Sequence, residues 1–220
     1  GGAAAPQGDV VGPGSATDES LALFDGTTGK LIKTGNNISN FPYTTKLGMP
    51  ASFNSGYATS INNLGVSVGT VSIGGAAHPV RWSLDGTFAD LGLPLTATAS
   101  IARDINDLGA IVGRGTVGGV VHPFKWTAGG VPTDLGLPLS ATTARVTAVN
   151  NSGVMVGNAT IAAVIHPIKW AADGTPTNLD PIGITEGQAE DINDSGVAVG
   201  YVKVDGVDHP FKWAADGTPT

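Results

Sequence analysis

The chain has 220 residues, of which 33 are glycine and 41% are hydrophobic, a length that suits one domain with a short additional segment. Eighteen acidic residues against 11 basic ones give a net charge of −7 without any basic cluster, which argues against nucleic acid as a partner, and no apolar run is long enough for membrane insertion. The absence of cysteine excludes disulfides, thiol chemistry and cysteine-ligated zinc.

Residues 1–42 contain no copy of the repeat found farther along the chain and are predicted to form a separate attachment segment. The segment begins as a linker rich in glycine and alanine. Farther on, Leu21 to Asp25 and Lys30 to Lys33 flank Gly26-Thr27-Thr28-Gly29, a pattern typical of a β-hairpin. An isolated hairpin is only marginally stable in water, so we expect this segment to need a partner surface.

The same stretch resembles a segment of tailed-bacteriophage tail fibres and related virion appendages. The resemblance begins at Gly8 and centres on Phe24-Asp25-Gly26-Thr27-Thr28-Gly29-Lys30-Leu31-Ile32. It departs from the pattern at Ser20 and Leu23, where that segment often carries a small apolar residue and arginine. The resemblance implies an attachment or trimerisation neck, a homotrimer in contact with other virion proteins, and an extracellular location on the virion.

A repeat of about 44 residues fills the chain from residue 43 to residue 220. Each copy contains histidine, proline, a variable residue, a basic residue and tryptophan in that order, and these phrases include every histidine and tryptophan of the chain: His78 with Trp82, His122 with Trp126, His166 with Trp170, and His209 with Trp213. A second phrase, built on asparagine and a glycine three residues later, precedes the first one in every copy; it starts at Ile61, Ile105, Val149 and Ile192. Four copies of two phrases indicate a repeat architecture.

The second copy shows the elements of one repeat. Asp104-Ile105 and Ala110 to Val112 flank a turn, Val120 to Trp126 is rich in β-branched and aromatic residues, and Val131 to Leu135 follows another turn. Four short antiparallel strands in about 44 residues match one blade of a β-propeller. The sequence therefore predicts an all-β fold, a small β-propeller of four repeats with four strands each, preceded by an extended or hairpin attachment segment.

The two ends of the repeat region have complementary phase. Leu47-Gly48-Met49-Pro50 matches Leu91-Gly92-Leu93-Pro94, so residues 44–47 correspond to a lone fourth strand, which the last copy lacks. We expect this strand to pair with the one containing Phe211 to Trp213 and to close a ring of four blades without free sheet edges. The alternative is a chain that continues into a ring of six to eight blades.

The two repeated phrases, together with Asp-Leu-Gly, resemble the HAF-family extracellular repeat of bacterial surface proteins over residues 47–220. The chain departs from that pattern because proline follows each histidine and a basic residue precedes each tryptophan. The resemblance implies architecture and an external location more than any chemistry.

The repeated tryptophan and histidine residues are predicted to form the repeat core. Side chains alternate along a strand, so a histidine four residues before a tryptophan lies on the same face and can pack near it. A metal site formed by the four histidines is the alternative, and a proline is expected at the start of the third strand. The Asn-Asp-x-Gly turns lack the alternating acidic spacing of calcium loops, so neither metal nor cofactor is predicted.

No motif of a hydrolase, a phosphate-binding loop or a zinc protease occurs, and no pair of carboxylates repeats, so no enzyme and no catalytic residue are predicted. Variable connections carry binding in many folds, and the connection from Pro50 to Tyr57 holds two aromatic residues. Phe53 and Tyr57 are therefore candidates for stacking on a sugar ring, with simple packing as the alternative.

These observations predict a structural virion protein, either a tail fibre or a decoration fibre, whose propeller head binds a host-surface receptor or glycan. The alternative is a bacterial secreted or surface propeller that binds a ligand or polysaccharide.

Overall fold

The computed structural model describes residues 23–24, 31–32, 47–50, 52–94, 96–180 and 186–220, and the chain divides into two units, Gly1–Lys46 and Leu47–Thr220. In the first unit, β1 (Leu23–Phe24) pairs antiparallel with β2 (Leu31–Ile32). These strands lie where the sequence predicts the two arms of a hairpin. The other residues of the predicted attachment segment lie outside the described residues.

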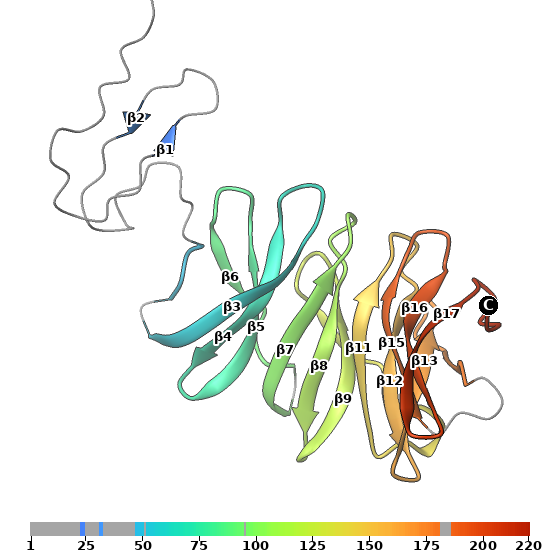
Figure 1. The fold of residues 1–220 in the computed structure, drawn as a ribbon. Helices are drawn as coiled ribbons and strands as arrows, with labels where there is room; N and C mark the ends of the chain where they lie inside the picture. Colours follow the sequence, from blue (N-terminus) through green and yellow to red (C-terminus); the bar gives the residue numbers. More distant parts are fainter. Residues whose placement is uncertain (1–22, 25–30, 33–46, 51, 95, 181–185) are drawn as a thin grey trace, which may run out of the picture. The chain divides into compact units, whose positions relative to one another are not determined.

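The second unit consists of four antiparallel sheets that follow one another along the chain, as the blades of a propeller do (Figure 1). The first three sheets have four strands each, and the last has three. In chain order the strands are β3 (Phe53–Ile61), β4 (Ser67–Ile73), β5 (Ala76–Trp82) and β6 (Phe88–Asp90); β7 (Ala97–Ile105), β8 (Ile111–Val117), β9 (Val120–Trp126) and β10 (Pro132–Asp134); β11 (Thr143–Val149), β12 (Met155–Ile161), β13 (Val164–Trp170) and β14 (Pro176–Asn178); and β15 (Glu186–Ile192), β16 (Ala198–Val204) and β17 (Val207–Trp213). A short 3-10 turn, η2 (Pro138–Ser140), precedes β11. The predicted all-β fold of propeller blades is confirmed.

Proline lies inside the third strand of each blade, so the predicted start of that strand at proline is wrong. β5 begins at Ala76, two residues before the histidine, and β9, β13 and β17 begin at the equivalent residue. The carbonyl of Pro79 accepts a hydrogen bond from Leu91 N at 3.0 Å, just past the end of β6. The backbone nitrogen of Pro79, which carries no hydrogen, lies on this same side of β5 and faces away from β4. The proline therefore costs β5 no hydrogen bond with β4.

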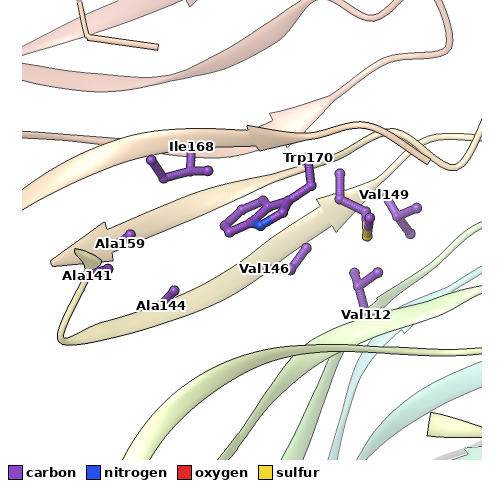
Figure 2. Close-up of a cluster of buried hydrophobic side chains, with 9 residues drawn as sticks. Val112, Ala141, Ala144, Val146, Val149, Ala159, Ile168 and Trp170 are labelled. Carbon is purple, nitrogen blue, oxygen red and sulfur yellow. The ribbon is translucent and has the colours of Figure 1, made fainter. Parts of the chain in front are cut away.

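Each blade builds its core around its tryptophan. The four tryptophans end the third strands and are at most 1% exposed. In the third blade Trp170 packs with Val146 and Ile168, and Figure 2 shows that Val112 of the second blade joins this cluster. The core therefore continues across the joint between blades, which is where neighbouring blades bury apolar surface against each other.

The connector after each fourth strand belongs to the core of the following blade. Leu135 packs against the cluster around Trp170, and Leu179 packs against the cluster around Trp213. The indole Nε1 of Trp213 also donates a hydrogen bond to Leu179 O at 2.8 Å. Each blade is thus completed by residues that precede its own first strand.

Leu47 occupies the same place against the first blade, and the predicted ring closure is wrong. Leu47 packs in the cluster around Trp82, whose Nε1 donates a hydrogen bond to Gly48 O at 2.6 Å. The first and last blades lie at opposite ends of the row (Figure 1). The prediction failed because strand phase does not reveal that the Leu-Gly connector packs on the blade that follows it.

The place of the fourth strand beside β17 is taken by the last residues of the chain. Pro219 forms a β-bridge with Trp213, and Thr220 N donates a hydrogen bond to Lys212 O at 3.0 Å. Pro132 and Pro176, the first residues of β10 and β14, pair with the tryptophans of their blades in the same register. Among the residues that the structure describes, no helix has the length and apolar composition needed to cross a bilayer.

Candidate functional site

The turns after the first strands are joined from blade to blade by asparagine side chains. Asn106 is only 6% exposed; its Oδ1 accepts from Ala110 N at 2.9 Å in its own turn, and its Nδ2 donates to Asn150 O of the next blade at 2.8 Å. Asn62 donates in the same way to Asn106, and Asn150 to Asn193. The asparagines that the sequence explains as turn residues therefore also hold neighbouring blades together.

A second set of hydrogen bonds links the turns of neighbouring blades through the residue that follows each of these asparagines. Asp107 accepts from the backbone N–H and the side-chain amide of Asn63 at 2.8 Å each, and from Asn151 Nδ2 at 3.1 Å. The backbone N–H of Asn63, followed by the two side-chain amides, holds the pKa of Asp107 below its ordinary value. The carboxylate of Asp107 is thus engaged by the blades on both sides.

In the first three blades, the basic residue before the tryptophan also reaches the following blade. Lys125 Nζ donates to Ala172 O at 2.9 Å, and Arg81 Nη1 donates to Ala128 O at 2.5 Å. Lys169 makes the equivalent contact with Ala215 O. The basic residue that departs from the HAF pattern therefore has a structural role at the joints.

These joints place the first strands β3, β7, β11 and β15 next to one another, and a pocket of about 270 Å³ opens along them. All four blades contribute to its lining, which consists of Tyr57, Ile101, Arg103, Arg114, Arg145, Thr147, Gln188 and Glu190. We call it the arginine pocket. Two further hollows of about 440 and 370 Å³ continue along the same strands to the asparagine turns.

Three of the four arginines of the chain converge on the arginine pocket. Burial lowers the pKa of Arg114, and the nearby charges of Arg145 and Arg103 lower it further. Arg145 Nη2 donates to Gln188 Oε1 at 2.8 Å, yet within the described residues none of the three guanidinium groups forms a salt bridge. The Glu190 carboxylate is held by Gln188 Nε2. The pocket therefore concentrates positive charge in an acidic chain, and an anionic ligand would relieve the repulsion.

The arginine pocket is built from positions at which the four copies of the repeat differ. One position of the first strand is occupied by Tyr57, Ile101, Arg145 and Gln188, and the position two residues later by Thr59, Arg103, Thr147 and Glu190. Asparagine, glycine and tryptophan recur at the framework positions, whereas at these two positions only threonine recurs, as Thr59 and Thr147. Thr59 and Thr147 donate hydrogen bonds to the following blade, but the fold does not require arginine at these positions, which leaves Arg103 and Arg145 available for binding.

The sequence-based choice of binding residues found one member of this pocket and missed the arginines. Tyr57 is 55% exposed and lines the pocket, whereas Phe53 is partly buried at the start of β3 and does not line it. Both were expected in a connecting loop, but β3 pairs with β4 from Phe53 opposite Ile73 onward. A comparison of the four copies at each first-strand position singles out Arg103 and Arg145, but not Arg114, which lies on β8, nor the fact that the three side chains meet.

The histidines lie at the blade surface, so the prediction that they belong to the repeat core is wrong. His78 and His122 place Nδ1 3.0 and 2.9 Å from the carboxylates of Asp90 and Asp134, each just at the end of a fourth strand. His166 contacts Asp180 in the same way, at 2.5 Å, and these three rings are partly buried. His209 is exposed. The aspartate beside each ring offers it a polar partner, which the tryptophan cluster cannot.

No group of three histidine, aspartate or glutamate side chains that could hold a metal ion occurs among the described residues. The turns that were considered for calcium use their oxygens to accept hydrogen bonds from neighbouring N–H groups. The arginine pocket is therefore the candidate ligand site in the described part of the chain, since three cationic side chains line it without a salt bridge.

No protein-family model matches the chain, and no curated protein matches it either. Among solved structures, it is similar to a protein described as TolB from Agrobacterium tumefaciens, with a TM-score of 0.57 and 11% identity over 70% of this chain and 59% of that one. It is also similar to TolB from Acinetobacter baumannii, with a TM-score of 0.55 and 14% identity over 77% of this chain and 44% of that one. The chain thus spans about half the length of these proteins. At such identities the similarity establishes the fold alone, an all-β row of propeller blades.

Proposed function

We propose that this protein is a non-catalytic binding protein whose arginine pocket holds an acidic saccharide of a host surface. The observation that supports this most is the convergence of Arg103, Arg114 and Arg145 at positions that the repeat leaves free. Guanidinium groups match carboxylate and sulfate geometry through paired N–H donors. The exposed ring of Tyr57 offers a flat apolar face on which a sugar ring can stack.

We further propose that the protein is a tail fibre or decoration fibre of a virion, located outside the cell and assembled as a homotrimer through its attachment segment. The support is the tail-fibre-like pattern around Phe24 to Ile32, together with the antiparallel pairing of β1 with β2. A bacterial secreted or surface propeller that binds the same class of ligand is the second candidate. Its support is the HAF-like pattern of the blades.

Binding of acidic saccharides tests the ligand class. Calorimetry with the full chain is expected to show binding of oligogalacturonates but not of neutral malto-oligosaccharides, and this binding should weaken as salt rises. Arg114→Gln is expected to reduce affinity about tenfold or more, because it removes a partly desolvated charge from the site.

Lys212→Gln is the matched control, since it makes the same change of charge on an exposed residue outside the arginine pocket. It is expected to bind as the unaltered chain does. Equal affinity for neutral and acidic sugars, or undiminished binding by a folded Arg114→Gln variant, would refute the proposed ligand class.

The mass of the assembly distinguishes the two candidates. If the protein is a fibre, a chain that starts at residue 43 should lose the trimer while its blades keep their β-type circular dichroism, because the attachment segment supplies the trimer contacts. If it is a free propeller, the shortened and full chains should have the same number of subunits in light scattering. That second result would argue against the fibre.

A further inference from the structure

Two sheet faces at the ends of the blade row have no neighbouring blade. We call the face of the first blade that carries Ile61 the leading face, and the face of the last blade that carries Val199 the trailing face. Ile61 is 66% exposed and Val199 is 45% exposed. Both are large aliphatic residues on strands, β3 and β16, in a unit whose other joints are closed.

The residues equivalent to Ile61 and Val199 pack against each other at every joint inside the row. A valine of one blade shares a buried cluster with the residue that ends the first strand of the next blade; the pairs are Val68 with Ile105, Val112 with Val149, and Val156 with Ile192. The valines are fully buried, and their partners are at most 7% exposed. Val199 and Ile61 therefore occupy the repeat positions that form the two halves of such a joint.

The polar groups of the two faces are complementary in the same sense. At each internal joint the earlier blade donates through an asparagine Nδ2, a backbone N–H and a basic side chain. On the trailing face these donors are Asn193 Nδ2, Asp194 N and Lys212 Nζ, and on the leading face the equivalent acceptors are Asn62 O, Asn63 Oδ1 and Leu84 O. Asn193 Nδ2 donates to no group among the described residues, and Lys212 is exposed.

The joint between the second and third blades shows that the terminal residues suit each other. There Asp107 N donates to Asn151 Oδ1 at 2.8 Å, and Asn151 Nδ2 donates back to Asp107 Oδ2 at 3.1 Å. The trailing face presents Asp194 at the first of these positions, and the leading face presents Asn63 at the second. The same aspartate–asparagine exchange is therefore available between the two ends.

We propose that the leading face of one copy of this chain docks on the trailing face of a second copy. A single chain cannot join its own two faces in the observed arrangement, because they lie at opposite ends of the row (Figure 1). A head-to-tail contact between copies is heterologous and closes into a ring when its rotation permits. The contact covers Ile61 and Val199 as the internal joints cover their equivalents.

Engineered cysteines test this contact in the full chain, which has no cysteine of its own. After mild oxidation, the double variant Ile61→Cys/Val199→Cys is expected to run as covalent multimers on a non-reducing gel. Each single variant should remain monomeric on the gel, because head-to-tail docking does not bring two identical positions together. The matched control, Ile61→Cys/Leu108→Cys, keeps Val199 and places the second cysteine at Leu108, a turn residue that is 72% exposed. It should give no multimers.

A second pair, Leu84→Cys/Lys212→Cys, probes the polar side of the same contact with a short bis-maleimide. Multimers from both pairs support docking of a second copy. Three results would overturn it: monomers from both double variants, multimers from a single variant, or an internal cross-link within one chain. Monomers would mean that a further blade or another protein covers these faces.

Discussion

Replacing Trp170 with alanine is expected to lower the free energy of unfolding by about 3 to 5 kcal/mol, the range for buried aromatic residues. Its indole is fully buried and packs with Val146 and Ile168 of its own blade and with Val112 of the preceding blade. The substitution therefore leaves a cavity that reaches the joint between two blades. Urea unfolding followed by circular dichroism measures the loss.

Val131→Ala is the control for this experiment, since Val131 is 62% exposed in a turn of the second blade. It is expected to change stability by less than about 0.5 kcal/mol, as surface substitutions usually do. If Trp170→Ala costs less than about 1 kcal/mol, the tryptophan does not hold the blade core together and the account of the joints is wrong.

Changing Asn106 to aspartate is expected to destabilise the protein by about 1 to 3 kcal/mol at neutral pH. The substitution keeps the acceptor for Ala110 N but replaces the Nδ2 donor with an oxygen that faces Asn150 O. The site is only 6% exposed, so burial and the nearby carbonyl should raise the pKa of the new carboxyl above its unfolded value.

The direction of the pH dependence follows from that raised pKa. The charged form is disfavoured in the folded state, so the loss of stability should be full above the folded pKa and should shrink as pH falls below it, when a protonated carboxyl can donate to Asn150 O. Asn193→Asp is the matched control, because Asn193 keeps its bond from Val197 N and is exposed. A dilute sample of Asn193→Asp as unstable as Asn106→Asp would contradict the joint role of the asparagine.

The elements of the blades could be predicted from sequence because each strand has a local cause. β9, for example, runs from Val120 to Trp126, the bounds that its β-branched and aromatic residues and the preceding pair Gly118-Gly119 predict, although the strand does not start at its proline. The burial of the tryptophans depends on strand alternation and on their recurrence at one phase. Both kinds of signal lie within a single repeat.

The joints between blades and the arginine pocket could not be predicted, because they depend on residues about 44 positions apart. Nothing local shows that Asn106 donates to Asn150, or that Leu47 packs on the blade that follows it. The arginines pose the same problem, since Arg103 and Arg145 occupy different positions of the repeat and come together only when the first strands align. The prediction for the histidines failed for a different reason. An aspartate at the end of the fourth strand is a better hydrogen-bond partner for the imidazole ring than the apolar core is.

The connector that completes the following blade has an evolutionary consequence. The leucine that packs in each blade core comes from the connector before that blade. The deletion or insertion of one whole repeat therefore removes or adds one such leucine together with one core that receives it. Recombination between copies in register would thus change the number of blades without leaving an unfilled core. The gene for such a chain can lengthen or shorten by whole repeats, while the variable first-strand positions gain or lose one side chain of the pocket at each step.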